Sequence, residues 1–169
     1  MTHPPLAAQC RISTPLGAMT LAATARGLAG AWFDGQAHHP GPLAAPLDEH
    51  QPWLRDAAAQ LSAYFAGRLR VFSLPLDAAG TPFQQAVWQA LAAVPHGATT
   101  HYGAIAQALG RPEAARAVGA AVGRNPLSLV VPCHRVLGRD GSLTGYAGGL
   151  ARKRALLELE GARVAAATP

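Results

Sequence analysis

The feature that most constrains the fold of this chain is a change of sequence pattern near residue 80. Before it, short apolar runs bounded by glycine and proline predict three strands and then one amphipathic helix, at 9–14, 19–24, 28–33 and 53–67. Directly after it stands a strong helix start, because Thr81 is a capping residue, Pro82 suits the first helical position and Gln84 completes a capping box. We therefore predict an α/β (α+β) fold of two domains, residues 1–80 and 81–169.

The second domain is predicted to be mostly helical. Apolar periodicity and glycine or proline stops place its helices at 82–94, 102–109, 112–123 and 151–160. The two central helices are short and are joined by a tight turn that contains Gly110, which is typical of a helix-turn-helix. In the first domain, residues 35–52 are expected to be a loop and residues 71–79 an extended stretch.

Composition fits a protein with a sizeable core. The chain has 169 residues, of which 50% are hydrophobic and 14% are charged, and no apolar run reaches membrane-spanning length. The N-terminus lacks a basic stretch followed by an apolar one, so the expected location is the cytoplasm. The two cysteines, Cys10 and Cys133, do not make a disulfide framework. His38 and His39 are adjacent and could bind a metal, but no cysteine or carboxylate stands at metal-binding spacing, so we expect a solvated loop there and no metal.

The excess positive charge lies in the last third of the chain. Residues 1–110 carry five basic and five acidic side chains, whereas residues 111–169 carry nine basic and four acidic ones, which accounts for the net charge of +5. A basic segment of this kind favours an anionic partner, and nucleic acid is the leading candidate.

A single thiol follows an apolar run in this basic segment. Residues 129–131, Leu-Val-Val, predict a buried strand or extended segment that Pro132 ends, and Cys133, His134 and Arg135 come next. A thiol is a good nucleophile only as a thiolate, and a histidine that takes the proton, or the charge of Arg135, would supply the needed bias. The alternative is that Cys133 is an inert core residue beside a structural histidine.

The helix predicted at 112–123 consists largely of alanine and glycine. Arg116 is its one long side chain in the two turns after Glu113. Small residues permit close helix packing in a core, and they also make a smooth helix that can approach DNA closely and insert one arginine. Gly119 costs roughly 1 kcal/mol of helix stability relative to alanine, which asks for a packing or functional reason.

Helical geometry singles out one carboxylate in the last helix. At about 100° per residue, three leucines define an inward face, and both Glu160 and Lys153 lie on it. A carboxylate on an apolar face needs a partner, and a ring nitrogen of His134 would satisfy it. The alternative is that Glu160 reaches water at a frayed helix end, and geometry alone leaves both interpretations open.

Taken together, these residues resemble a known family, the O6-alkylguanine-DNA alkyltransferases. Residues 131–136, Val-Pro-Cys-His-Arg-Val, resemble the acceptor motif of that family, and further motifs occur in the family's order and spacing over 81–161. They are Tyr102-Gly103-x-Ile105-Ala106, Ala115-Arg116-Ala117-Val118-Gly119, Asn125-Pro126, Tyr146-x-Gly148-Gly149-Leu150 and Leu156-Leu157-x-x-Glu160-Gly161. The resemblance implies an N-terminal ribonuclease-H-like domain of sheet and helix, for which the first 80 residues carry no signature of their own. It implies a C-terminal domain with the helix-turn-helix and the acceptor cysteine.

The resemblance also implies direct DNA repair by a single-turnover enzyme without a cofactor. Cys133 would take the alkyl group from O6-alkylguanine, and from O4-alkylthymine, in double-stranded DNA and keep it irreversibly. His134 would accept the thiol proton through a water, and Glu160 would hold the imidazole. The other residues implied in catalysis are Asn125, Tyr102 and Lys153.

The same resemblance implies how DNA is held. The helix-turn-helix would enter the minor groove, Tyr102 would help to rotate the damaged nucleotide out of the stack, and Arg116 would fill the gap that it leaves. The residues implied to contact DNA are Arg116, Tyr102, Ala115, Ala117, Gly119 and Arg124. The residues implied to line the pocket for the base are Val136, Tyr146, Ala147, Gly148, Ser128 and Arg135. A monomer is expected, and cooperative binding on DNA stays open.

Three positions differ from some relatives. Ala147 stands where some relatives have a serine, and Ser128 stands where some have a proline in the pocket, which bears on the range of lesions and not on the basic chemistry. Cys10 is the only cysteine of the first domain, so the zinc that some members hold there is not expected.

Two other functions would use the same residues. A turnover Cys-His-Glu hydrolase is disfavoured because no oxyanion-hole motif is evident and Arg116 would have no role. A non-catalytic damage sensor, like the alkyltransferase-like proteins, is disfavoured because those proteins lack the acceptor cysteine, whereas Cys133 is present.

Overall fold

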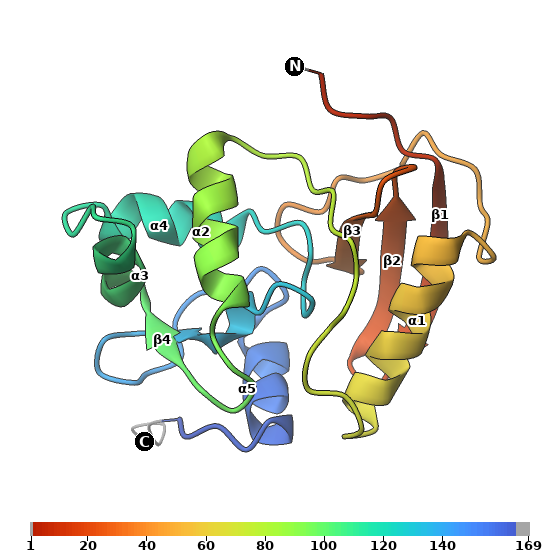
Figure 1. Ribbon diagram of the computed structural model, residues 1–169. Coiled ribbons are helices and arrows are strands. Elements are labelled where there is room, and N and C mark those ends of the chain that lie inside the picture. The colour runs from red at the N-terminus through yellow and green to blue at the C-terminus, as the bar shows by residue number, and fades with distance from the viewer. Residues whose placement is uncertain (1, 165–169) are drawn as a thin grey trace. The chain divides into compact units, whose positions relative to one another are not determined.

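The computed structural model describes residues 2–164, and the chain divides into two compact units (Figure 1). The N-terminal unit contains the first 79 residues together with Pro126–Ser128, and the C-terminal unit contains the remainder. A single boundary near residue 80 therefore does not describe the division fully, because a short segment from the second half of the chain belongs to the first unit. No helix among the described residues is both long and apolar enough to cross a membrane.

The N-terminal unit is a three-stranded antiparallel sheet with one helix packed against it (Figure 1). The strands lie in the order β1-β2-β3, and their bounds, with that of the helix, are β1 Ala8–Thr14, β2 Gly17–Ala23, β3 Leu28–Phe33 and α1 Pro52–Phe65. The buried residues of α1 recur at helical spacing, at Leu54, Ala57, Leu61 and Tyr64. The three strands and the helix predicted for this half are confirmed, with ends that shift by at most two residues.

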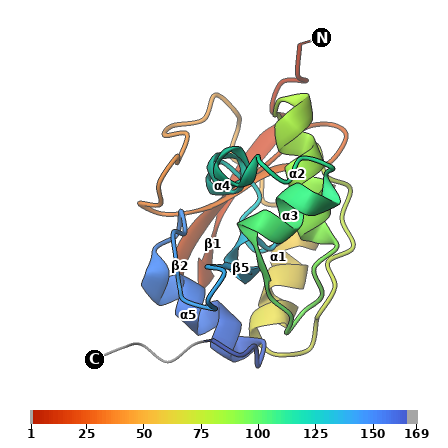
Figure 2. The same cartoon turned by 90° about the vertical axis from the view of Figure 1, so that its left-hand side faces the viewer.

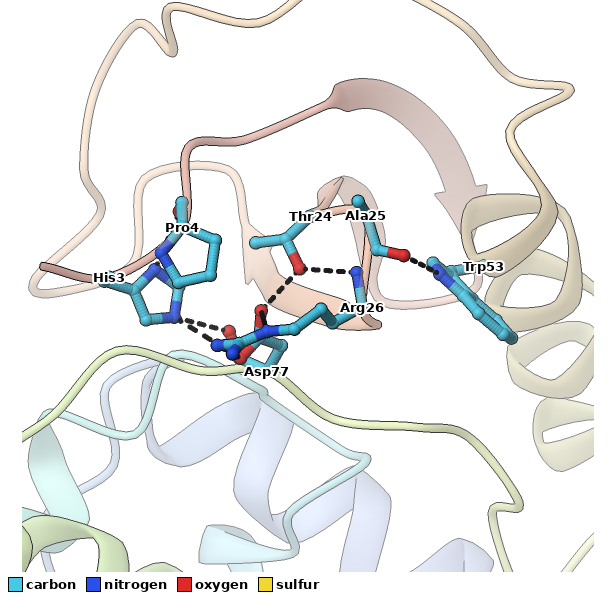
Figure 3. A network of polar contacts seen from close by, with 7 residues as sticks. All are labelled: His3, Pro4, Thr24, Ala25, Arg26, Trp53 and Asp77. Atoms are coloured by element: carbon cyan, nitrogen blue, oxygen red, sulfur yellow. Dashed lines mark hydrogen bonds and ion pairs between the residues drawn. The ribbon is translucent and has the colours of Figure 1, made fainter.

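The segment predicted to be extended after α1 is tied to the sheet near Asp77 (Figure 3). Leu28 donates its N–H to the Pro75 carbonyl at 2.8 Å and accepts from the Asp77 N–H at 2.7 Å. The Asp77 carboxylate accepts hydrogen bonds from Arg26 and from Thr24. The segment therefore forms one bridge to β3 rather than a strand of its own.

The C-terminal unit contains three packed helices, a short parallel strand pair and a last helix. The helices α2 (Pro82–Ala92), α3 (Tyr102–Ala108) and α4 (Ala115–Gly123) contact one another. Figures 1 and 2 show them on one side of the strand pair, with the last helix on the other side. The remaining elements are β4 Thr100–His101, the 3₁₀ turn η1 Cys133–Arg135, β5 Val136–Leu137 and α5 Leu150–Leu159.

The predicted start of α2 is confirmed in detail. The Thr81 hydroxyl accepts from the Gln84 N–H at 3.2 Å, and the Gln84 side chain accepts from the Thr81 N–H at 3.0 Å. Pro82 occupies the first turn, where its missing N–H costs nothing. The Trp88 indole on this helix donates to the Ala121 carbonyl at 2.9 Å, which fixes α2 against α4.

Two predictions about local structure were wrong. The helix expected from residue 112 begins at Ala115, because the Ala114 N–H closes a turn onto the Arg111 carbonyl at 2.9 Å before the helix starts. The run 129–131 is buried, as predicted, but it is not a continuous strand: Leu129, with a φ of 74°, and Val130 form a turn, and only Val131 makes a bridge. A side-chain hydrogen bond overrides β propensity here, since the Asn125 side-chain amide holds the Val131 carbonyl at 2.9 Å.

Candidate active site

Cys133 lies at the first position of η1, directly before β5. Pro132 precedes the turn, and the pairing of Val136 with Thr100 fixes the chain that follows it. The cysteine is 3% exposed and His134 is fully buried, so both side chains are held in a packed interior. The acceptor cysteine and the histidine that follows it are therefore both held inside the C-terminal unit.

His134 is oriented by a buried carboxylate. Its Nε2 lies 2.8 Å from Glu160 Oε1, and neither side chain is accessible to solvent. A carboxylate can only accept, so Nε2 carries the hydrogen and the lone pair remains on Nδ1. Nδ1 has no hydrogen-bond partner among residues 2–164. The predicted contact of Glu160 with His134 is confirmed, and it leaves one ring nitrogen able to accept a proton.

Arg135 is the second partner of Glu160. Its Nε and Nη2 donate to the two carboxylate oxygens at 2.9 and 2.8 Å, and its Nη1 donates to the Val94 carbonyl at 2.6 Å. This bidentate geometry satisfies the guanidinium and compensates the buried carboxylate. Since its charge is neutralised by Glu160, Arg135 does not supply the bias toward thiolate that the sequence led us to expect of it.

The pKa of the Cys133 thiol also shifts in the direction opposite to the one that a preformed thiolate would need. Burial raises the pKa of the Cys133 thiol, while a hydrogen bond from Asn125 and the charge of Lys153 oppose that rise. Burial also lowers the pKa of His134, against the effect of Glu160, so the imidazole is neutral at neutral pH. The resting site therefore holds a thiol beside a neutral base, and not a preformed thiolate.

Lys153 lies on α5 and is fully buried. Its Nζ donates to the carbonyls of Val136, of Thr144 at 2.6 Å and of Gly145 at 3.1 Å. Burial lowers its pKa to about 8, and the Cys133 charge acts in the opposite direction. The predicted inward position of Lys153 is confirmed.

A loop that follows β5 lies beside Tyr102. A Cβ built on Gly145 would lie 3.8 Å from the Tyr102 hydroxyl, so this backbone and the tyrosine face the same space. Tyr146 packs on Gly148, where an added Cβ would meet its ring at 2.7 Å, so only glycine fits there. Tyr146 and Ala147 are half-buried, and Gly148 is buried.

The helix-turn-helix presents the small residues of α4 partly to solvent. Arg116, Ala117 and Arg124 are exposed, Ala115 and Gly119 are half-buried, and the opposite side of α4 packs inward. Gly119 faces the Tyr102 ring, where a Cβ would make ordinary contact at 3.7 Å. A cavity of about 400 Å³ opens beside this surface and is lined by His101, Tyr102, Gly103, Gln107, Pro112, Ala115 and Arg139.

Comparison with known proteins decides the family. Residues 82–162 match the DNA binding domain of 6-O-methylguanine DNA methyltransferase, and residues 11–78 match its ribonuclease-like domain. The methylated-DNA–protein-cysteine methyltransferase of Mycobacterium tuberculosis H37Rv is 47% identical over 161 residues, covering 92% of this chain and 93% of its own. The chain belongs to this family. It is an enzyme of DNA repair that moves an alkyl group from DNA to a cysteine.

Two further relatives agree with that assignment. A crystal structure of Mycobacterium tuberculosis OGT in complex with DNA superposes with a TM-score of 0.84 at 47% identity and covers 91% of this chain and 92% of its own. The methylated-DNA–protein-cysteine methyltransferase of Salmonella typhimurium is 62% identical over 103 residues, covering 60% of each chain. The two-domain α+β fold predicted for this alkyltransferase family member is therefore confirmed.

The structure gathers most, but not all, of the residues predicted for the alkyltransferase site. Ser128 belongs to the N-terminal unit, where its hydroxyl donates to Gln36 at 3.2 Å. Sequence reasoning missed several groups that the structure adds to the C-terminal unit: the carbonyls of Val94 and Thr144, and the cavity residues His101, Gln107 and Arg139. Backbone carbonyls leave no signal in a side-chain pattern, whereas Arg139 could have been noted from the basic character of its segment. Among the described residues, no group of three or more His, Cys, Asp or Glu side chains could hold a metal ion.

Proposed function

We propose that this protein repairs O6-alkylguanine in double-stranded DNA by transferring the alkyl group irreversibly to the Sγ atom of Cys133. The observation that carries the proposal is the buried His134–Glu160 pair, which leaves the His134 Nδ1 lone pair free next to the only cysteine of the C-terminal unit. A neutral base beside a buried thiol is suited to remove its proton only when an electrophile is in place.

The chemistry balances with no cofactor. The thiol proton passes to His134 Nδ1, and the sulfur electron pair forms the new bond to the alkyl carbon. The carbon–oxygen bond breaks, its electron pair stays on the guanine, and the base takes back one proton from the imidazolium. The products are an S-alkyl cysteine and a normal guanine, and the thioether cannot be reversed by the same groups.

The reaction requires the damaged nucleotide to leave the base stack, because a buried thiol cannot reach an atom inside a duplex. We assign this step to the helix-turn-helix, which would enter the minor groove. Arg116 would fill the gap that the extruded nucleotide leaves in the stack, and Tyr102 would lie beside the extruded base. Support comes from the exposed position of Arg116 on an α4 surface made of alanine and glycine. Arg124, Ala115, Ala117 and Gly119 lie on or beside the same surface. The loop residues Tyr146, Ala147 and Gly148, with Val136, are proposed to line the pocket, and O4-alkylthymine is proposed as a second substrate.

The test is the mass of the intact protein after incubation with a duplex that contains O6-methylguanine, followed by peptide mapping. We expect a gain of one methylene mass at Cys133 that stops at one per protein. Repaired DNA without a mass gain would mean turnover, and bound but unrepaired DNA would mean a damage sensor. The Cys133→Ala variant should lose transfer and keep DNA binding.

A second test addresses base extrusion. Arg116→Ala should slow repair of duplex DNA by roughly 10-fold or more while leaving reaction with the free base O6-benzylguanine unchanged. Arg124→Ala, at the residue directly after α4 and outside the gap, serves as the control for lost positive charge on the same DNA-facing surface. Equal losses on duplex and free base would rule out the role of Arg116.

A further inference from the structure

Lys153 is the only lysine of the chain, since the other thirteen basic residues are arginine. It is fully buried on α5, and no carboxylate among the described residues forms an ion pair with it. A buried ammonium without a carboxylate is costly, and such a group needs every hydrogen bond that it can make. This arrangement asks for a functional reason.

The three bonds of Lys153 join two parts of the site. One of the three carbonyls is that of Val136, which is the first residue of β5 and lies three residues after Cys133. Residues 133–136, which begin with the alkyl-accepting cysteine, form the acceptor segment. The other two are the carbonyls of Thr144 and Gly145, where the loop 144–149 begins. The ammonium has three N–H groups and meets three carbonyls, so no donor remains for another partner.

Other hydrogen bonds lie toward the far end of the loop. The Gly149 N–H returns to the Tyr146 carbonyl at 2.9 Å within the loop itself, and Arg152 donates to the Gly148 carbonyl at 3.1 Å. Lys153 holds the other end of the loop at Gly145, whose backbone lies beside the Tyr102 hydroxyl.

We infer that Lys153 is a positioning residue whose ammonium holds the loop 144–149 against the acceptor segment and favours the Cys133 thiolate, so that one proton controls both the pocket and the nucleophile. The inference rests on the proposed function, because it names what regulates that same site. It assigns Lys153 no contact with the alkylated base.

The chemistry of the amine explains why the proton matters. A neutral amine has two N–H groups and a lone pair, so one of the three carbonyls would lose its donor and face that lone pair. The groups that act electrostatically on Lys153 are the Cys133 thiol and His134 of η1, while Arg135 in the same turn is held by Glu160. On its own helix, Arg152 is directed to the Gly148 carbonyl. The pKa of about 8 puts the loss of the proton in an accessible range.

Two effects of pH then oppose each other. An isolated thiol nucleophile reacts faster as pH rises, because more of it is thiolate. Here the same rise removes the Lys153 proton, which frees the loop and removes the charge that favours the thiolate. We therefore expect the rate of alkyl transfer to reach a maximum near the pKa of Lys153 and to fall on the alkaline side.

The unique lysine makes the experiment direct. Lysine labelled with ¹³C at Cε gives one resonance, whose titration reports Lys153 alone in the full-length protein. Single-turnover transfer from free O6-benzylguanine is measured over the same pH range, so that DNA binding is not involved. Hydrogen exchange of residues 144–149, corrected for its intrinsic pH dependence, reports the loop.

We expect the lysine titration, the alkaline fall in rate and the increase in loop exchange to share one midpoint. Lys153→Met should lower the transfer rate at neutral pH by roughly 10-fold or more, show fast loop exchange already and lack the alkaline fall. Arg154→Met, the matched control one residue along the helix, should keep the wild-type pH profile.

A wild-type rate that keeps rising through the lysine titration, with unchanged loop exchange, would overturn the inference even if Lys153→Met does not fold. A different result would separate the two claims. If loop exchange increases with the titration of Lys153 but the protein transfers no alkyl group at any pH, the positioning role of Lys153 is upheld and the proposed function is rejected.

Discussion

Each unit of this protein holds an arginine, a histidine and a carboxylate in one cluster, and the two clusters differ mainly in their access to water. In the N-terminal unit Arg26 donates to Asp77 at 2.8 and 3.2 Å, with His3 Nε2 3.7 Å from the same carboxylate (Figure 3). In the C-terminal unit Arg135 donates to Glu160 at 2.8 and 2.9 Å, with His134 at 2.8 Å. The side chains of Arg26 and Asp77 are 65% and 12% exposed, whereas those of Arg135 and Glu160 are 7% and 0% exposed.

The comparison teaches that similar hydrogen-bond geometry carries different consequences. Water can replace a lost partner of Arg26, so that cluster contributes little to the stability of the fold. Around Glu160 no water replaces a lost partner, and removal of one charge leaves another uncompensated in the interior. The buried cluster can therefore fix the tautomer of His134, which an exposed cluster could not do as firmly.

The largest difference between the two clusters is expected in the loss of stability when the carboxylate is replaced. Glu160→Gln keeps the shape of the side chain but leaves Arg135 buried without a charge partner, so the free energy of unfolding should fall by about 3–5 kcal/mol. Loss of the negative charge beside His134 Nε2 should also slow alkyl transfer by roughly 10²-fold, because the imidazolium that forms when His134 takes up the thiol proton loses its counter-charge. Urea unfolding and single-turnover kinetics measure the two effects. Asp77→Asn is the matched change in the other unit, and a loss there as large as that of Glu160→Gln would contradict the comparison.

A double-mutant cycle isolates the buried pair. Arg135→Met keeps much of the apolar stem and removes the guanidinium, which should cost about 2–4 kcal/mol because Glu160 loses its main partner. The double variant with Glu160→Gln should be less unstable than the sum of the single variants, with a coupling energy of about 1–3 kcal/mol from denaturant unfolding. Additive losses would mean that the pair acts only through packing.

Buried His134 should make the stability of the protein depend on pH in mild acid. The folded pKa of His134 is lowered by burial, so the unfolded chain takes up a proton near pH 6.5 when the folded protein does not. Stability should therefore fall as pH drops below about 6.5, by at most about 1.4 kcal/mol per pH unit for this one proton. His134→Asn should remove that slope when unfolding is followed from pH 7.5 to 5. A slope that survives in His134→Asn would assign it to another group.

The smallest effect is expected for Arg26. The hydrogen bonds from Arg26 are the main reason that the pKa of Asp77 is lowered. The ion pair therefore stabilises the fold above the ordinary aspartate pKa, and this stabilisation is lost as pH falls through the lowered pKa. Arg26→Ala should lower the melting temperature only slightly at neutral pH, because the arginine is exposed. The difference from wild type should disappear in acid, and a difference that persists there would point to packing of the arginine stem.

Local signals in the sequence predicted the elements that depend on neighbouring residues. The start of α2 followed from a capping box, and β3 followed from an apolar run between turn residues. The inward position of Glu160 followed from helical spacing alone, since it requires only that α5 be a helix. These features are encoded within a few turns of chain.

The features that were missed depend on specific hydrogen bonds that local propensity and residue spacing do not encode. The turn at Leu129 is fixed by the Asn125 amide, which overrides the β propensity of the run 129–131. Arg135 was one of the two residues that could have favoured the thiolate, but it pairs with a carboxylate that comes 25 residues later in the chain. Lys153 could be assigned to the interior from periodicity, yet its three acceptors are backbone carbonyls, which every residue has and no pattern distinguishes.

The segment Pro126–Ser128 has a consequence for how the protein is made. It belongs to the N-terminal unit, where Ala31 donates to the Pro126 carbonyl at 2.8 Å and accepts from the Ser128 N–H at 3.0 Å. A chain leaving the ribosome exposes its N-terminal part first, so β1, β2, β3 and α1 emerge before the segment that completes them. The N-terminal unit cannot be completed before α2, α3 and α4 have also been synthesised. The acceptor cysteine follows Ser128 by only five residues. Completion of the first unit and delivery of the reactive thiol are therefore nearly simultaneous steps of synthesis.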